Sequence, residues 1–463
     1  TQRAALSDEA RQALARGQDH PELRGLTHPH PHWDLFRAIN PNALQSYNSL
    51  MGEWWRRREA FPELLAALLQ LTATTPNDEA GARAALAALD KRHGWERAAE
   101  ATAVQLFNPS QGKGSSNPKA VWSSPNNLSG FWLTEWLKAV GFFHGGMTRN
   151  PAGSKDRKSY VLMPHNLEWG THRAVLHDFQ ASVTRSETAL KLDIYAVLRY
   201  TSALLQHFEA ARVEEFAAEL FGRRAADLVS GLQTAFYKDL GNSTVVMNMA
   251  TLQLPRWVRV DSRAYLPHLQ TALDEHQVII RGLDEKRGDQ FALLSHYRDF
   301  LSSGDLRAFF DFTTAYSGFL ISQMERRAYV RPFTVTTLEV LFMNSDDADG
   351  KYAAIISNEG FRNVAYAIRH STIVPQGHKA RGVKPAVQVR YGLGQQLTRK
   401  SAYPDEFLAE LSEFLFLYNA ENEQLREKER NPGRKNVRTA DIEVITELID
   451  RFGSKVVCAM LVA

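Results

Sequence analysis

Residues 190–208 read LKLDIYAVLRYTSALLQHF and decide the fold class of the chain. Apolar side chains recur there every three or four positions, which is the spacing of one face of an α-helix. We predict that the helical pattern extends over residues 186–236 and forms a core. The apolar positions of this face are Leu190, Ile194, Leu198, Leu204, Leu205, Phe208, Phe216, Leu220 and Leu228.

The C-terminal third repeats this helical pattern. Helices are expected after the Gly304-Asp305 cap, from about Thr334, from Asp405 and from Thr439, with Gly453 as a stop signal. Four amphipathic helices suffice for a bundle. The charged, glycine-flanked stretch RGLDEKRGD at residues 281–289 predicts a linker before it.

The β-strand signal is weaker and lies between the helices. Residues 155–162 (KDRKSYVL) indicate a short strand at a hairpin edge, and residues 245–260, which contain Pro255, indicate an edge strand or a loop. The predicted fold is therefore predominantly α with some β (α+β). It comprises an irregular N-terminal α+β body at residues 1–285 and a C-terminal helical bundle at residues 286–463.

Composition sets the limits for function. The chain has 463 residues, 44% hydrophobic and 23% charged, which is typical of globular proteins. A net charge of +3 is too small to indicate nucleic-acid binding, so that hypothesis depends on where the charges lie. The single cysteine, Cys458, excludes disulfides and cysteine-based zinc sites within this sequence and suits the cytoplasm. No apolar run approaches the roughly 20 residues of a membrane span.

A basic loop occupies residues 107–137, FNPSQGKGSSNPKAVWSSPNNLSGFWLTEWL. Its glycines and serines offer backbone N–H groups to an anion, while Phe131 and the residues after it predict a helix that anchors the loop to a core. A Walker A motif is excluded, because Gly114 follows Lys113. An ordinary surface loop is the alternative to nucleic-acid contact. The candidate contact residues are Asn108, Gln111, Lys113, Lys119, Asn126 and Asn127.

Two further regions are basic. Between residues 101 and 155 the only acid is Glu135, and a cluster of cations follows at Arg149, Lys155, Arg157 and Lys158. Residues 361–404 contain no acid at all and carry interleaved tyrosines, a composition typical of binding a sugar-phosphate backbone with occasional base stacking. We expect this band on the outer surface of the bundle or in its loops. Its cations are Arg362, Arg369, Lys379, Arg381, Lys384, Arg390, Arg399 and Lys400.

Metal chemistry has two weak candidates. His28, His30 and His32 alternate with prolines that favour an extended turn, and the His177-Asp178 pair could ligate a metal ion. Neither is accompanied by a second ligand pair, so we expect no catalytic residue, metal or cofactor.

The chain resembles the large subunit of type I CRISPR surveillance complexes, the Cascade-like effectors of the MYXAN type. The resemblance rests on NPSQGKGSSNPKA, FWLTEWLKAVGFF, FRNVAYAIRHSTI, VRYGLGQQLTRK, FLYNAEN and TADIEVITELIDRFGSKVV. It implies a non-catalytic subunit that binds guide RNA and target DNA, recognises the motif beside the target (the PAM) and stabilises the displaced strand of the R-loop.

The same resemblance implies partners and organisation. The C-terminal helical region is similar to the small subunit of other subtypes, which in several cases is also made separately. The partners would be the other subunits of the complex and a separate helicase-nuclease or transposition proteins, in antiviral defence or in a transposon, with no membrane partner. Two alternatives stay open, a metal-dependent phosphohydrolase that uses His177 and Asp178, and a helical scaffold that binds no nucleic acid.

Overall fold

The computed structural model describes most of the chain, which forms two compact units, Thr1–Thr148 and Arg149–Ala463. The division differs from the predicted boundary at residues 285 and 286. The helix just after that boundary, α12 (Gly288–Ser303), packs on α8 (Ala189–Ala210) and on strand β7 (Thr244–Gln253). The described residues are 6–10, 12, 20–23, 58–96, 100–101, 130–183, 188–210, 222–241, 244–345, 350–428 and 434–463.

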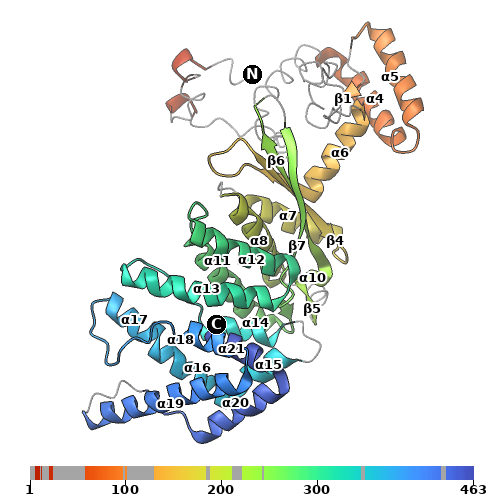
Figure 1. Cartoon of the computed structure of the whole chain (residues 1–463). Helices are drawn as coiled ribbons and strands as arrows, with labels where there is room; N and C mark the ends of the chain where they lie inside the picture. Colours follow the sequence, from red (N-terminus) through yellow and green to blue (C-terminus); the bar gives the residue numbers. More distant parts are fainter. Residues whose placement is uncertain are drawn as a thin grey trace, which may run out of the picture. The chain divides into compact units, whose positions relative to one another are not determined.

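The first unit contains two helices that pack together, followed by a short strand pair that leads into a third helix (Figure 1). Asp78 caps the second helix by accepting a hydrogen bond from the Gly81 backbone N–H, at 2.9 Å. Phe131 and Leu133 are buried with Leu71 and Leu86, which confirms the predicted anchoring helix. The elements are η2 (Pro21–Leu23), η3 (Arg58–Ala60), α4 (Phe61–Thr74), α5 (Glu79–His93), β1 (Glu100–Ala101), β2 (Gly130–Phe131) and α6 (Trp132–Gly145).

An antiparallel sheet has the strand order β3-β4-β6-β7, and its strands β4, β6 and β7 lie in the second unit. Strand β4 lies between two neighbours, so the predicted hairpin-edge position of residues 155–162 is wrong, whereas β7 is an edge strand as predicted. Residues 229–239 form strand β6 and not the end of a long helix. The strands are β3 (Gly146–Arg149), β4 (Arg157–Pro164), β6 (Val229–Asp239) and β7, with a separate pair of β5 (Arg223–Arg224) and β8 (Arg259–Val260).

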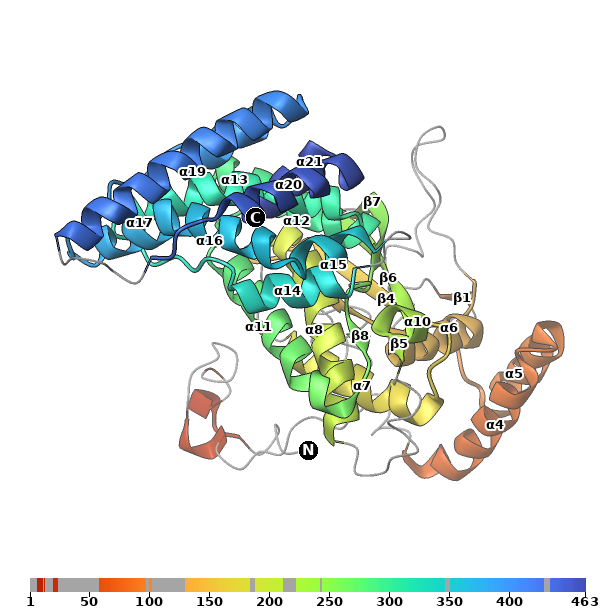
Figure 2. The same cartoon turned by 90° about the horizontal axis from the view of Figure 1, so that it is seen from below.

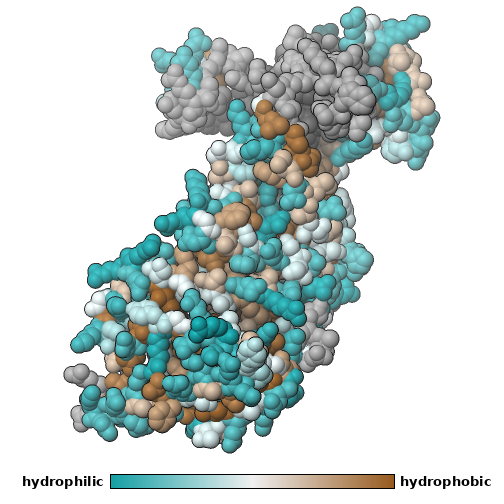
Figure 3. All heavy atoms as spheres, in the orientation of Figure 1, coloured by the Kyte–Doolittle hydropathy of each residue, from teal (hydrophilic) through white to brown (hydrophobic). Residues whose placement is uncertain are grey.

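Gly231 explains why β6 pairs so closely with β7. Its φ is 155°, and a Cβ at this position would collide with the carbonyl oxygen of Leu252 on the neighbouring strand. The N-terminal half of β7 also pairs with β6, but it exposes apolar side chains, which gather at the end of this hairpin in Figure 3. They are Val245, Val246, Met247 and Met249.

Helices account for the rest of the second unit, and the protein as a whole has a mostly helical α+β fold (Figure 1). Helices α8 and α12 pack against the sheet, and α7 and α11 pack against α8. The helices up to the C-terminal bundle are α7 (Trp169–Ser182), α8, α10 (Ala225–Leu228), η6 (Arg263–Tyr265), α11 (Leu266–Arg281) and α12.

The C-terminal helices confirm the predicted caps. The Asp305 side chain accepts a hydrogen bond from the first turn of α13, and Gly453 follows α20. The helix predicted from about Thr334 is α14, whose first turn donates to the Thr334 side chain. Helix α16 lies among α17, α19, α20 and α21 (Figure 2), so much of the acid-free band is packed inside the bundle. The helices are α13 (Leu306–Glu325), α14 (Val335–Met343), α15 (Lys351–Ile356), α16 (Glu359–Ser371), α17 (Ile373–Ala380), α18 (Leu393–Lys400), α19 (Pro404–Glu427), α20 (Thr439–Phe452) and α21 (Ser454–Val462).

Candidate nucleic-acid interface

The candidate residues of the first basic loop lie outside the described part of the chain. They are Asn108, Gln111, Lys113, Lys119, Asn126 and Asn127. Their assignment to a nucleic-acid contact stays a prediction.

The second cluster of cations, around β4, is mostly engaged within the protein. Arg149 donates hydrogen bonds to the carbonyl oxygens of Val183 (2.6 Å) and Gln180 (2.8 Å) and so holds the end of α7. The guanidinium of Arg157 lies over the ring of Tyr237, and burial lowers its pKa. Only Lys155, in the turn before β4, is exposed.

Lys158 points into the interior. Side chains alternate across a strand, and Lys158 shares the inner face of β4 with Tyr160 and Leu162. Its ammonium lies 2.6 Å from Asp193 on α8, and the same carboxylate accepts hydrogen bonds from Tyr160 (2.9 Å) and from Arg298 on α12 (2.8 Å). Burial lowers the pKa of Lys158, while Asp193 opposes this. Its buried position contradicts the assignment of Lys158 to nucleic-acid binding.

In the acid-free band, three cations are neutralised by acids from other segments. Arg390 forms an ion pair with Glu421 at 2.7 Å, and Lys400 forms one with Glu406 at 2.7 Å. Arg362 lies 3.9 Å from Glu339. The absence of acids within residues 361–404 of the sequence therefore overstates the positive charge of this region in space.

Arg369 is also directed inward. It donates a hydrogen bond to the carbonyl oxygen of Phe333 at 3.2 Å, and burial lowers its pKa. Its role in the fold is to hold the segment before α14.

Four cations of the band remain at the surface: Lys379, Arg381, Lys384 and Arg399. None of them forms an ion pair with any residue of the described ranges. Among the described residues, the Arg381 side chain hydrogen-bonds the carbonyl oxygen of Gly377 in its own helix, at 3.2 Å. Three of the four follow one another at the end of α17 and in the turn after it, so their charges face solvent together.

Tyr391 adds an aromatic ring to this surface. Lys379 donates a hydrogen bond to the Tyr391 hydroxyl at 3.1 Å, which raises the pKa of Lys379. The hydroxyl in turn donates to Gln376 at 2.9 Å, and Tyr391 is 46% exposed. We define Lys379, Arg381, Lys384 and Tyr391 as the α17 surface.

Tyr391 is positioned by the residue before it. The Arg390 backbone N–H donates to the carbonyl oxygen of Ser371 at 2.8 Å, and its side chain is fixed by Glu421. Arg434, whose side chain is 2% exposed, lies 3.6 Å from the same carboxylate and over the ring of Tyr418. Two arginines, Arg390 and Arg434, thus share the carboxylate of Glu421.

A second exposed group lies outside the residues predicted from the sequence. The turn between α13 and α14 reads ERRAYVRP at residues 325–332, and in it Arg326 and Arg327 are exposed while Tyr329 is 88% exposed. We name residues 326–331 the α13–α14 turn. The clustering of arginines around one tyrosine is visible in the sequence, but it lies outside the acid-free stretch and adjoins Glu325.

The proposed metal ligands do not form a larger cluster in the described residues. His177 and Asp178 lie 3.3 Å apart on the exposed side of α7. Among the residues with described positions, no group of three or more His, Cys, Asp or Glu side chains is arranged to hold a metal ion. His28, His30 and His32 fall outside those residues.

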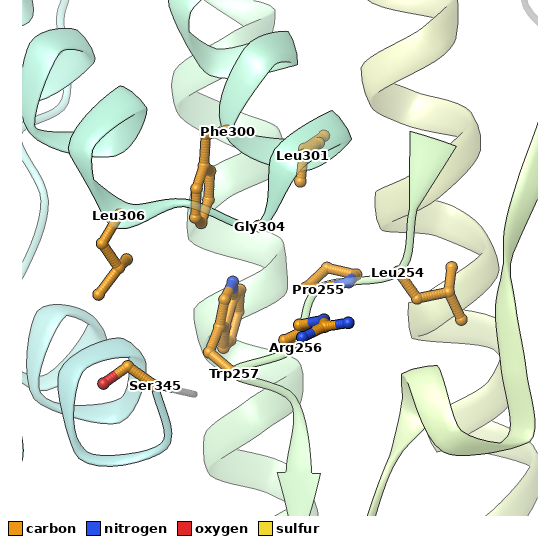
Figure 4. Close-up of a pocket in the computed structure, with 9 residues that line it drawn as sticks. All are labelled: Leu254, Pro255, Arg256, Trp257, Phe300, Leu301, Gly304, Leu306 and Ser345. Atoms are coloured by element: carbon orange, nitrogen blue, oxygen red, sulfur yellow. The ribbon is translucent and has the colours of Figure 1, made fainter. Parts of the chain in front are cut away.

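A small pocket lies between the β7–β8 connection and the turn from α12 to α13 (Figure 4). Trp257 and Phe300 face each other across it, and its volume is about 20 Å³, enough for one water molecule. The indole N–H of Trp257 has no described partner, which fits a bound water. A pocket of this size cannot enclose a cofactor.

Comparisons with known proteins add no relative: neither a family model, nor a curated protein, nor a solved structure matches this chain. Of the helices that the structure describes, none is long and apolar enough to span a membrane.

Proposed function

We propose that this protein is a nucleic-acid-binding subunit of an RNA-guided DNA surveillance complex. The observation that carries the proposal is the α17 surface, where Lys379, Arg381 and Lys384 are exposed beside Tyr391 and form no ion pair with a carboxylate of the described residues. Cations without acid partners attract a phosphate backbone, and an adjacent ring suits unpaired bases.

The sequence resemblance supports the more specific part of the proposal. A large subunit of a Cascade-like complex would contact the target-adjacent motif and hold the displaced DNA strand, while guide RNA pairing reads the sequence. We assign the displaced strand to the α17 surface and the target-adjacent motif to the loop at residues 108–119. In this role the protein is not itself an enzyme, and cleavage or transposition depends on partner proteins.

The test is salt-dependent binding of a fluorescent 20-nucleotide single strand to the full-length protein. The variant Lys379→Ala/Arg381→Ala/Lys384→Ala should bind more weakly. Because each phosphate contact contributes about 0.7 to the slope of log K against log salt for single strands, the slope should fall by about two units.

A matched control removes the same charge elsewhere in the second unit. Arg173, Lys286 and Arg307 are exposed on α7, before α12 and at the start of α13. Their triple alanine variant should keep the wild-type slope to within the error. Equal losses in both triple variants would show a nonspecific charge effect, and no loss in either would reject the α17 surface as a nucleic-acid contact.

A further inference from the structure

The α13–α14 turn is held rigidly at its first end. After α13 the backbone N–H groups of Arg326, Arg327 and Ala328 donate to the carbonyl oxygens of Ser322 (3.4 Å), Met324 (3.1 Å) and Gln323 (3.0 Å). These bonds satisfy carbonyl groups that a helix end would otherwise leave without partners. The chain therefore leaves the helix along one defined path.

The far end of the turn is fixed as well. The Tyr316 hydroxyl donates to the Arg331 carbonyl oxygen at 2.8 Å, and Phe333 is buried in the aromatic core. The Arg369 side chain donates a hydrogen bond to the Phe333 carbonyl oxygen, and the Thr334 N–H donates to Glu275 at 2.7 Å. A turn anchored at both ends loses little conformational entropy when a ligand binds.

Between these anchors, the side chains of residues 326–329 are exposed, whereas Arg331 lies 3.7 Å from the buried carboxylate of Glu275. Tyr329 is the most exposed of the large hydrophobic side chains in the described chain, at 88%. Arg327 has a φ of 56°, the left-handed region, and is the one non-glycine residue with positive φ in the described ranges. Glycine would occupy this position without strain, so the fold maintains an arginine side chain here at a conformational cost.

The turn adjoins the α17 surface. Helix α17 packs against α13, and the charge of Glu325, the last residue of α13, acts on Lys379. Arg326 and Arg327 follow Glu325 directly in the chain, so the turn begins beside the α17 surface.

We propose that Tyr329 is a stacking site for one unpaired nucleobase, with Arg326 and Arg327 contacting the phosphates beside it. This inference rests on the proposed function and specifies its ligand as single-stranded nucleic acid. A ring presented on a fixed turn offers its face to a base only when that base is not paired and stacked in a duplex. The site therefore distinguishes unpaired strands from duplexes, which the cations alone do not.

The experiment measures binding of three fluorescent probes by the full-length protein: a 20-nucleotide oligothymidine, an abasic phosphodiester of the same length and a 20-base-pair duplex. Tyr329→Ala should weaken oligothymidine binding about fivefold or more, from the loss of one stacked base. The affinities of this variant for the abasic probe and for the duplex should stay within twofold of the wild-type values. Tyr329→Phe should bind like the wild type, because it keeps the ring.

Tyr403 supplies the matched control. It is 65% exposed but precedes the acidic first turn of α19, at Asp405 and Glu406. Tyr403→Ala should bind oligothymidine within twofold of the wild type. An equal loss with Tyr403→Ala would overturn the assignment to Tyr329.

Two other results would also overturn the inference. Unchanged oligothymidine binding by Tyr329→Ala would mean that the ring contacts no base, as would be the case for a protein-binding surface. An equal loss on the abasic probe would assign the effect to phosphate contacts or to the turn itself. Both differ from failure of the proposed function, in which the wild-type protein shows no salt-dependent binding to any probe.

Discussion

Two cationic clusters look alike in the sequence and differ in the folded protein. Lys158 follows Lys155 and Arg157 in one basic run, and Lys379, Arg381 and Lys384 form the other. In the first, the alternation of strand β4 places Lys158 inside against Asp193. In the second, the end of α17 and the turn after it leave all three cations in solvent.

The difference shows that a run of like charge predicts a binding surface only when the local structure exposes it. Acids that neutralise a run can come from far along the chain, as Glu421 does for Arg390 and Asp193 for Lys158. The interior accepts a cation where it supplies a carboxylate, and the surface needs none because water solvates the charge.

The largest effect is expected from removing the buried acid. Asp193→Ala leaves Lys158 and Arg298 without their carboxylate, and an uncompensated buried charge lowers the free energy of unfolding by about 3–5 kcal/mol. Urea unfolding at pH 7.5 measures this change. Lys384→Ala, at the exposed cluster, should change the same free energy by no more than about 0.5 kcal/mol.

A rescue variant makes this contrast sharper. Replacing the whole cluster with apolar residues, as Lys158→Met/Asp193→Leu/Arg298→Met, should recover most of the lost stability, because no charge is then buried. If Asp193→Ala and Lys384→Ala lowered the free energy of unfolding by similarly small amounts, the buried and exposed clusters would not differ in their contribution to stability. This result would contradict the distinction between the two clusters.

His276 is a buried base without a carboxylate partner, so the pH dependence of stability tests whether the interior accepts a positive charge only beside an acid. His276 is fully buried against Trp257, Phe309 and Phe333, and burial lowers its pKa from 6.5 to about 3. Below pH 6.5, His276 becomes protonated in the unfolded chain but stays neutral in the folded protein. The free energy of unfolding therefore falls as the pH falls. From pH 7.5 to pH 5.0 the loss from this residue is about 2 kcal/mol.

The measurement is urea unfolding of the wild type and of His276→Asn at both pH values. The variant is expected to be less stable at each pH, since it disturbs the contact with the Tyr297 hydroxyl, but its decline toward pH 5.0 should be smaller by about 2 kcal/mol. Parallel declines would mean that His276 takes up its proton in the folded state.

The smallest effect on stability is expected from relieving the left-handed backbone conformation of Arg327. Arg327→Gly relieves the left-handed conformation and, after the added freedom of the unfolded chain, should raise the free energy of unfolding by about 0.5–1 kcal/mol. The same change should weaken single-strand binding, whereas Arg327→Lys should preserve both properties. A variant that gains stability and keeps full affinity would show that the Arg327 side chain has no binding role.

Much of the fold follows from local sequence patterns. Strong helical spacing, with the Gly304-Asp305 cap before α13, located the C-terminal helices, because these signals act within a few residues. Residues 229–239 form a strand where a helix was predicted, since the spacing of Leu228 and Leu232 fits a helix face and only Gly231 marks the close strand pairing.

The site was predictable only in part. The acid-free run led to Lys379, Arg381 and Lys384, but pairing of Arg390 with Glu421 and of Lys400 with Glu406 depends on tertiary contacts that no local pattern encodes. Tyr329 was missed because its importance depends on exposure, and exposure of a tyrosine in a short turn is set by the packing of the helices on either side.

The buried cluster around Asp193 also has a consequence for synthesis on the ribosome. Lys158 precedes Asp193 by 35 residues, whereas Arg298 follows it by 105. At about 5–20 residues per second, Arg298 is made roughly 5–20 s after Asp193. During that interval Lys158 and Tyr160 are the partners that stabilise the carboxylate, so β4 and α8 can pair before α12 has been translated.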